Sequence, residues 1–201
     1  MNAMHKLSYG LFVVTARGDK GMNGCITNTV MQVTTDPNRI TLAVNKSNYT
    51  HDLIVKSGEF NVSVISEDAT FDLFKHFGFQ SGRDVDKFGY YEPWGVSTNR
   101  LAYVTEGTNA YISAKVVSTV DCGTHTLFLA DVTESKVLTD VPSATYAYYF
   151  ANIKPKPQPV EPSAPTRWRC KICGYELEAD TLPDDFVCPW CKHGAVDFEK
   201  V

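Results

Sequence analysis

Cys170-Lys-Ile-Cys173 and Cys188-Pro-Trp-Cys191 are two matched C-x-x-C pairs near the end of the chain, with residues 174–187 between them. Two such pairs bring four thiolates to the corners of one tetrahedron, which suits either Zn²⁺ or a single iron ion. Zinc in such a site would be structural, whereas iron would carry electrons. Disulfides are disfavoured because the N-terminal residues lack the apolar core of a secretory signal. The sequence therefore predicts a metal site formed by these four cysteines.

The residues around the two pairs suit a small metal-binding domain. Gly174 follows the first pair, and a glycine there allows positive φ, so that backbone N–H groups turn toward a sulfur. Such hydrogen bonds tune the potential of a metal. Aromatic side chains that can shield the site stand close by in the sequence: Trp168, Tyr175, Phe186, Trp190 and Phe198.

This C-terminal segment resembles the rubredoxins. The shared motifs are Cys-x-x-Cys-Gly-Tyr at 170–175, Leu-Pro-Asp-Asp-Phe at 182–186 followed by Cys-Pro-Trp-Cys at 188–191, and the closing Asp-Phe-Glu-Lys-Val at 197–201. The resemblance implies one iron bound by the four cysteines and carrying one electron at a time. The alternative is a zinc ribbon that braces a partner surface, because either metal suits four sulfurs.

Composition limits the class of protein. With 43% hydrophobic and 12% aromatic residues among 201, the chain can bury a core, and the length suits one or two domains. A formal charge of −4 argues against nucleic-acid binding, which needs a basic patch. No apolar run approaches the roughly 20 residues that cross a bilayer. The expected location is cytoplasmic, with no membrane or nucleic-acid partner.

A proline-rich segment predicts the domain boundary. Residues 152–166 hold five of the ten prolines, and such a stretch favours an extended, semi-rigid spacer. The sequence thus predicts a first domain at 1–151, a linker at 152–166 and a metal domain at 167–201. The acidic residues between the cysteine pairs could steer the metal domain toward basic partners, or could form a merely solvated face.

The first domain is expected to be mainly β. Apolar, β-branched runs predict strands, whereas two segments carry helix signals. Many strands with few helices favour a mostly antiparallel barrel. The expected strands are 9–16, 22–33, 39–45, 60–66, 110–120, 126–134 and 145–150. The expected helices are 50–57, capped by Asn48 or Thr50 and stopped by Gly58, and 69–77.

Neither G-x-G-x-x-G nor a Walker loop is present, which argues against a Rossmann nucleotide domain. Three polar stretches form the candidate cofactor pocket instead. The first offers groups that match the edge of a flavin ring: Asn23, Gly24, Cys25, Thr27, Asn28 and Thr29. The second enters a helix and offers groups for a phosphate monoester: Asn45, Lys46, Ser47, Tyr49 and Thr50. The third adds groups for the same phosphate: Ser81, Arg83 and Lys87. Taken singly, each stretch is better explained as a strand turn, a capped helix or a solvated loop.

Taken together, residues 5–151 resemble the flavin reductase-like family, including the flavoredoxins. The matching pieces are the three stretches above, Gln32–Pro37, and Asp121-Cys-Gly-Thr-His-Thr-Leu-Phe128, which is similar to the family's GDHxLF segment. The resemblance implies a split β-barrel that binds FMN, usually as a homodimer. It makes His125 the candidate catalytic residue, near the flavin and the nicotinamide of NAD(P)H. A lone histidine on a strand is otherwise more often structural.

Three further residues lie in or near these stretches. Cys25 and Cys122 have no C-x-x-C partner, and both are expected to be small buried apolar residues. His51 either contacts a flavin phosphate or belongs to the first turn of the helix.

The two domains together resemble the high-molecular-weight rubredoxins of anaerobic bacteria. That resemblance implies an oxidoreductase in which NAD(P)H reduces FMN, FMN reduces the iron, and the iron reduces a flavodiiron protein that removes NO or O₂. The alternative is an NAD(P)H:flavin reductase that supplies free reduced flavin, with the cysteine site a structural zinc ribbon. A third possibility is a non-catalytic interaction module stabilised by flavin or metal.

Overall fold

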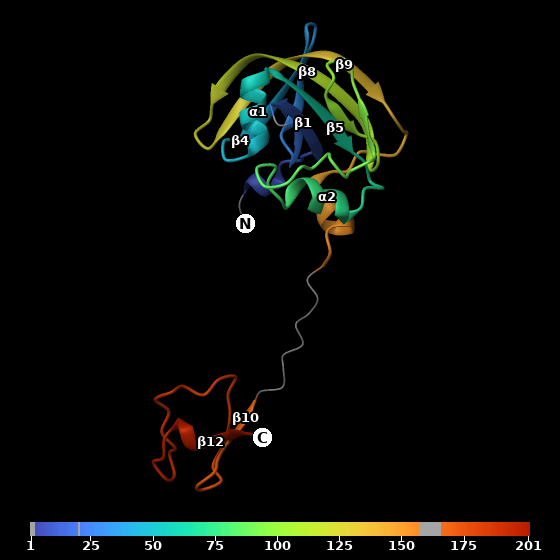
Figure 1. Cartoon of the computed structure of the whole chain (residues 1–201). Coiled ribbons are helices and arrows are strands. Elements are labelled where there is room, and N and C mark those ends of the chain that lie inside the picture. The colour runs from blue at the N-terminus through green and yellow to red at the C-terminus, as the bar shows by residue number, and fades with distance from the viewer. Residues whose placement is uncertain (1–2, 20, 157–165) are drawn as a thin grey trace. The chain divides into compact units, whose positions relative to one another are not determined.

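The chain folds as two compact units, Met1–Pro155 and Lys156–Val201, seen in the computed structural model in Figure 1. The structure describes residues 3–19, 21–156 and 166–201. Most of the linker expected at 152–166 therefore lies outside the described residues. Its first two residues close the helical segment that ends at Ile153.

The first unit is built on one seven-stranded antiparallel sheet in the order β2-β1-β5-β8-β9-β4-β3. Figure 1 shows the strands curling around α1, as expected for the split β-barrel predicted from the sequence. The strands of this sheet are β1 (Phe12–Gly18), β2 (Gly21–Thr27), β3 (Val30–Thr35), β4 (Asn38–Asn45), β5 (Glu59–Ile65), β8 (Thr108–Asp121) and β9 (His125–Val137).

Shorter elements complete the first unit. A two-stranded sheet pairs β6 with β7, and helical segments occupy the connections and the end of the unit. They are η1 (Ala3–Lys6), α1 (Tyr49–Ser57), α2 (Phe71–Gly78), β6 (Trp94–Val96), β7 (Ala102–Val104), α3 (Tyr146–Tyr148) and the π-helical turn η2 (Tyr149–Ile153).

Hydrophobic residues form one core on each face of β1. Because strand side chains alternate, Val14 packs inside the barrel with Leu53 and Ile54 of α1, whereas Val13 packs on the opposite face with residues of α2. Phe77, at the end of α2, is almost fully buried in this second core. The two cores therefore hold α1 and α2 against opposite faces of β1.

The ends of α1 follow the signals expected from the sequence. Asn48 is the N-cap, and its side chain accepts a hydrogen bond from the backbone N–H of Thr50. Gly58 ends the helix in the left-handed conformation at φ 68°, and its N–H donates to the Ile54 carbonyl. These caps set where the polar stretch 45–51 enters the helix.

Two expected strands of the first unit were wrong in detail, and two short strands were missed. Residues 145–150 form α3 and the start of η2 rather than a strand, because the Thr145 side chain caps a helical turn by accepting from the Tyr148 N–H. The single strand expected at 22–33 is interrupted between Thr27 and Val30, giving β2 and β3. The short strands β6 and β7 were not anticipated.

The second unit is a three-stranded sheet in the order β11-β10-β12, and both pairs of neighbouring strands are antiparallel. Its elements are β10 (Arg167–Cys170), β11 (Glu176–Glu178), η3 (Ala195–Asp197) and β12 (Phe198–Lys200). Its small core consists of Cys170, Cys188 and Phe198 with partly buried side chains around them. The metal site is therefore the centre of this unit rather than a surface addition.

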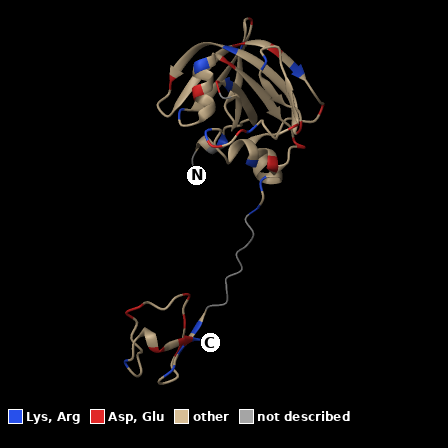
Figure 2. Cartoon of the chain, in the orientation of Figure 1, with Lys and Arg blue, Asp and Glu red and all other residues tan. Residues whose placement is uncertain are grey.

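Basic and acidic residues are scattered over the ribbons of both units in the view of Figure 2. Within the described ranges, no helix combines the length and the apolar character that a transmembrane span requires.

Candidate functional site: a four-cysteine centre and a cavity in the flavin reductase-like unit

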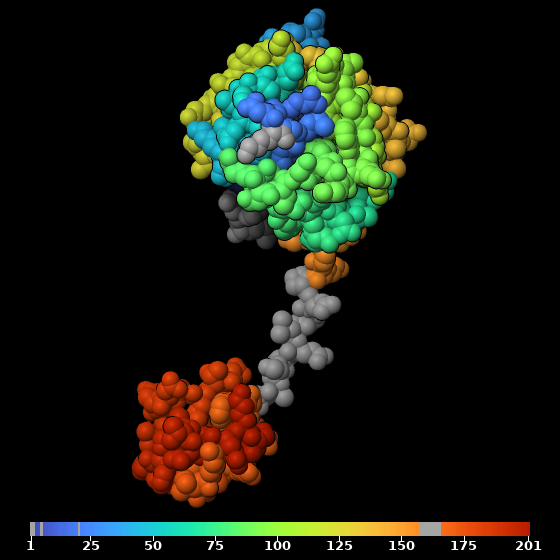
Figure 3. All heavy atoms as spheres, viewed as in Figure 1, coloured from blue at the N-terminus to red at the C-terminus, as the bar shows by residue number. Residues whose placement is uncertain are grey.

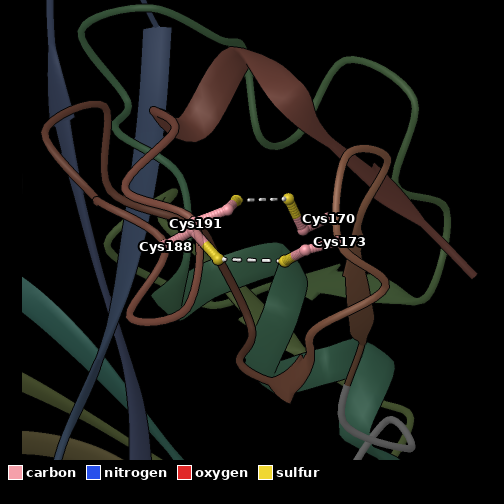
Figure 4. Close-up of side chains that lie close together, drawn as sticks. All are labelled: Cys170, Cys173, Cys188 and Cys191. Atoms are coloured by element: carbon pink, nitrogen blue, oxygen red, sulfur yellow. Dashed lines mark hydrogen bonds between the residues drawn. The ribbon is translucent and has the colours of Figure 1, made fainter.

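The four cysteines of the two C-x-x-C pairs converge in the second unit. Figure 4 shows their sulfurs facing one another, and all four Sγ atoms lie within 4.8 Å of each other. The Sγ–Sγ distances are 3.6 Å for Cys170–Cys191 and 3.5 Å for Cys173–Cys188. A disulfide would need about 2.05 Å, whereas a tetrahedron of ~2.3 Å metal–sulfur bonds has edges of roughly 3.8 Å. The geometry therefore fits one tetrahedral metal ion.

Two equivalent backbone turns present the sulfurs. In the first, the Cys170 N–H donates to the Tyr175 carbonyl, and the Gly174 N–H donates to the Cys170 carbonyl. In the second, the Cys188 N–H donates to the His193 carbonyl, and the Lys192 N–H donates to the Cys188 carbonyl. Each turn places one left-handed residue directly after its second cysteine, Gly174 at φ 75° and Lys192 at φ 64°.

The thiols influence one another's ionisation. Burial opposes ionisation of Cys188, but backbone hydrogen bonds from Cys191 and Trp190 outweigh it and lower its pKa to about 6. For Cys191, the His193 N–H favours the thiolate, yet burial and the neighbouring sulfurs raise its pKa to about 12. Four sulfurs this close resist carrying four negative charges, so a metal cation is the natural compensation.

Aromatic side chains pack around the cysteine centre, as the sequence indicated, but Trp190 is 70% exposed and lies outside this core. Tyr175 and Trp190 form an edge-to-face pair with centroids 5.4 Å apart, and Phe186 and Phe198 form another at 5.3 Å. Cys170 and Cys188 are buried, whereas the second cysteine of each pair is partly exposed. The partly exposed Cys173 and Cys191 bring the sulfur centre close to the protein surface.

The first unit contains a cavity of ≈ 460 Å³, within the usual size of cofactor sites. All three polar stretches contribute to its wall, together with the end of α2. Figure 3 shows the face where the chain near residue 21 (blue), the start of α1 (cyan) and the segment after α2 (green) adjoin. The cavity is lined by Cys25, Ile26, Asn45, Ser47, Asn48, Tyr49, Phe77, Gly78, Phe79, Gln80, Ser81, Gly82 and Lys87.

The first polar stretch lies along β2 and beyond its end. Cys25 is buried and lines the cavity, and burial raises the pKa of its thiol. Asn23 donates from Nδ2 to the Thr50 hydroxyl at 2.8 Å. Thr27 and Thr29 share a hydrogen bond of 2.8 Å, and the Thr29 hydroxyl also donates to the Ala43 carbonyl. These two threonines and Asn28 do not line the cavity.

The second stretch divides between the cavity and the neighbouring hairpin. Asn45 and Ser47 line the cavity, where Asn45 Oδ1 accepts from the N–H and the hydroxyl of Ser47. Lys46 instead pairs with Asp121 at 2.7 Å, and this ion pair lowers the pKa of the Asp121 carboxyl. Thr50 is buried and does not line the cavity, and its hydroxyl accepts from Asn23.

The third stretch brings Ser81 and Lys87 to the cavity, whereas Arg83 lines an adjoining cavity of ≈ 350 Å³. Arg83 pairs with Asp52 at 2.7 Å and lies 5.0 Å from the Tyr49 ring centroid. The guanidinium hydrogen bond lowers the pKa of Asp52. Lys87 Nζ donates to the carbonyls of Gly24 and Phe77 at 2.8 and 2.9 Å. Each of the three cations expected near a phosphate therefore has a partner within this unit.

The two histidines of interest sit near the start of β9. His125 is paired with Asn45 across β4 and β9, and its Nδ1 lies 2.9 Å from the Thr124 hydroxyl. His51 belongs to the first turn of α1, and its Nε2 lies 2.8 Å from the Thr126 hydroxyl. Cys122, expected to be buried, is exposed at the tip of this hairpin, because a two-strand turn offers no core.

Several cavity residues were missed by the sequence reasoning. Phe77, Gly78, Phe79 and Gln80 end α2 and continue beyond it, and they line the cavity although only helical packing had been considered for this segment. Phe79 is 67% exposed, which is unusual for a large aromatic side chain. Phe79 could have indicated this role in the sequence, because it breaks the three-residue spacing of Phe71, Phe74 and Phe77.

The cavity residues fit a flavin. Asn23 Oδ1 is a buried acceptor without a hydrogen-bond partner in the described part of the chain, beside Gly82 of the cavity wall. A Cβ at position 82 would lie 1.9 Å from Asn23 Oδ1, so glycine is required for this close approach. An apolar ring surface from Ile26 and Phe77 with a few polar groups at its rim is the usual composition of a cofactor site.

Comparisons with known proteins identify the family of each unit. Residues 4–156 match the family described as Flavin reductase like domain, and residues 168–199 match Rubrerythrin, rubredoxin-like domain. A high molecular weight rubredoxin of Moorella thermoacetica is 35% identical, covering 99% of this chain and 98% of that protein. A ferric-chelate reductase (NAD(P)H) of Archaeoglobus fulgidus is 37% identical, covering 78% of this chain and 92% of that protein.

Solved structures share the fold of the first unit. Flavin reductase PheA2 in its native state is 26% identical with a TM-score of 0.61, covering 72% of this chain and 88% of that one. An FMN-binding protein from Thermus thermophilus is 24% identical with a TM-score of 0.60, covering 67% and 74%. The second match, at this identity, supports the fold alone. The chain therefore belongs to the flavin reductase like family of oxidoreductases, and it carries the C-terminal rubredoxin-like domain found in a high molecular weight rubredoxin.

Proposed function

We propose that this chain is an electron-transfer oxidoreductase that takes electrons from NAD(P)H through FMN to one iron ion bound by four cysteines. The observation that carries the proposal is the presence, in one chain, of a flavin reductase-like unit with a suitable cavity and a tetrahedral four-sulfur centre. When bound, FMN accepts two electrons as a hydride and releases them singly, which matches an iron that accepts one.

The cavity residues have distinct roles in this proposal. The ring packs against Ile26 and Phe77, while Asn23 and the backbone of the first stretch meet its polar edge. The phosphate lies at the start of α1, where the Ser47 hydroxyl and the positive end of the helix dipole favour an anion. Arg83, held over Tyr49 next to the main cavity, is the nearest candidate guanidinium for that phosphate.

His125 is proposed to lie on the nicotinamide side of the flavin. Its support is the strand register, which places His125 opposite Asn45, a residue of the cavity wall. His125→Asn should then slow reduction by NADH while leaving FMN binding intact. Unchanged reduction kinetics would remove His125 from the reaction.

The acceptor of the electrons is proposed to be a flavodiiron protein that reduces NO or O₂. Support comes from the similarity to a high molecular weight rubredoxin and from exposed acids of the second unit that form no ion pair within the described ranges, namely Glu176, Asp180, Asp184 and Asp185. Such acids steer a basic partner at low ionic strength. Transfer rates that do not fall with added salt would contradict this steering.

The working assembly is proposed to be a homodimer. Apolar side chains that are exposed on β3, β8 and β9 support a covered surface there: Met31, Val33, Val117, Val120 and Val137. Light scattering of the purified protein should then give about twice the chain mass of 22.4 kDa. A monomer at micromolar concentration would overturn this assembly.

Anaerobic stopped-flow spectroscopy tests the electron route. Protein carrying FMN and iron is mixed with NADH, and the flavin absorption should bleach before the ferric–thiolate absorption is lost. Flavin reduction without iron reduction would overturn the route. The second candidate function is a reductase that releases free reduced flavin and holds a structural zinc ion. Zinc in the elemental analysis of the same sample, together with weakly retained flavin, would indicate that function.

A further inference from the structure

Lys87 is the one lysine of the cavity wall, and it is only 3% exposed. It belongs to the loop that follows α2, yet its ammonium reaches inward to β2 and to the end of α2. There Nζ donates to the Gly24 carbonyl at 2.8 Å and to the Phe77 carbonyl at 2.9 Å. Lys87 therefore holds the loop, the strand and the helix around one wall of the cavity.

The charge of Lys87 is not neutralised by a carboxylate. None of the ion pairs formed by residues 3–19, 21–156 and 166–201 includes Lys87, whereas Lys46 pairs with Asp121 and Arg83 pairs with Asp52. An ammonium has three N–H donors, and the two carbonyls use two of them. One donor and a full positive charge thus remain available at the cavity wall.

A buried ammonium is costly unless an acceptor or an anion compensates it. Burial accordingly lowers the pKa of Lys87, whereas the nearby Cys25 acts in the opposite direction. The oxidised flavin ring is neutral, whereas the two-electron-reduced ring carries a negative charge near neutral pH. A cation at this wall would therefore interact more strongly with the reduced ring.

We propose that Lys87 faces the flavin ring rather than its phosphate, and that its buried charge makes the cavity bind reduced flavin more tightly relative to oxidised flavin. The ring is favoured over the phosphate because Lys87 bonds Gly24, next to Cys25 in the stretch assigned to the ring edge. This inference rests on the flavin binding proposed above, and it assigns Lys87 a role that a backbone clamp alone would not have.

The test compares the affinities of the full-length protein for oxidised and reduced flavins. Lys87→Gln keeps a donor for the two carbonyls and removes the charge, and Lys87→Met removes both. Each variant is titrated anaerobically with oxidised and dithionite-reduced FMN, and then with riboflavin, which lacks the phosphate. Loss of the charge that faces the reduced ring should raise the ratio of reduced to oxidised Kd at least about tenfold.

The two flavins separate the alternatives. The same rise in the Kd ratio with FMN and riboflavin supports contact with the ring. Weaker binding of FMN alone, in both redox states, would place Lys87 at the phosphate and overturn the inference. Equal weakening of all four flavin forms would mean that Lys87 is only a clamp. A wild-type protein that binds no flavin would instead overturn the proposed function.

Lys75→Met is the matched control. Lys75 lies on the solvent side of α2 in an ion pair with Asp72, so this variant removes the same charge close to the cavity without touching its wall. Its Kd ratio should equal that of the wild type. Lys87→Arg keeps the charge and should retain most of the preference for reduced flavin. This variant keeps the test usable if loss of the charge destabilises the loop.

Discussion

Position 192 shows how one residue departs from the pattern of the metal-binding turns. The two turns have the same hydrogen bonds and both need a left-handed residue after the second cysteine, but the first uses Gly174 and the second uses Lys192. A side chain in this conformation costs roughly 1–2 kcal/mol because Cβ crowds the following carbonyl. The second turn therefore holds strain that the first does not.

Lys192→Gly should stabilise the second unit by about 1 kcal/mol, since glycine adopts φ 64° without that crowding. Guanidinium unfolding of the metal-loaded chain, followed at the metal–thiolate absorption, measures the change. Lys171→Gly, in the first turn and without positive φ, removes an equivalent side chain and should give no gain. A lower unfolding midpoint for Lys192→Gly would contradict the account of strain.

At the level of elements, Glu134 connects β9 to its neighbours. Its carboxylate accepts from the Tyr111 hydroxyl of β8 at 2.6 Å and from the N–H and hydroxyl of Thr98 in the loop before β7. These hydrogen bonds, from Thr98 first and then Tyr111, lower the pKa of Glu134. The hydrogen bond between Tyr111 and Glu134 also raises the pKa of Tyr111 to about 12. One side chain thus ties the long hairpin to the small β6–β7 sheet.

The contribution of Glu134 should depend on pH. Because its folded pKa is lower than its unfolded pKa, the unfolded chain binds more protons in the acid range, and stability is lost as pH falls below the usual value of about 4.3. Glu134→Gln should lower the free energy of unfolding by about 1 kcal/mol at pH 7 after allowance for solvent screening, and by less at pH 4.

Urea unfolding at both pH values measures this difference. Glu92→Gln is the control, because Glu92 is exposed and its side chain has no hydrogen bond in the described part of the chain. That variant should match the wild type at pH 7 and at pH 4. A Glu134→Gln defect of equal size at both values would mean that the carboxylate charge does not matter.

At the scale of the whole molecule, the two compact units have separate cores. The first contains two hydrophobic clusters around β1, whereas the second relies on a few side chains around the sulfurs. A core this small rarely supports a fold without a metal. Stability of the second unit should therefore depend on its ion, and stability of the first should not.

Cys170→Ser tests this independence. Serine is a poor ligand for a soft site, and Cys170 is buried at the centre of the unit, so the variant should lose its metal and the fold of residues 167–201. FMN binding should be unchanged, as measured by retained flavin absorption after gel filtration. Cys122→Ser, at an exposed position, serves as the control and should keep both. Loss of FMN in Cys170→Ser would show that the units are coupled.

The motifs that are local in the chain could be predicted. The four cysteines converge as expected, because a C-x-x-C pair presents both sulfurs from a single turn whatever surrounds it. Asn48 and Gly58 cap helix α1 at its two ends, as expected, because capping depends on neighbouring residues. The mainly β class follows from alternation within each strand, which is likewise a short-range property.

The sequence by itself determined the cysteine centre, the helix caps and the fold class, whereas the tertiary structure alone decided what each cation near the cavity contacts. Lys46 meets Asp121, which is 75 positions away, and Lys87 meets Gly24, which is 63 positions away. Both contacts follow from how distant strands and loops are brought together. Periodicity and spacing describe the geometry within one segment, but the partner of a long side chain depends on which other segment packs beside it.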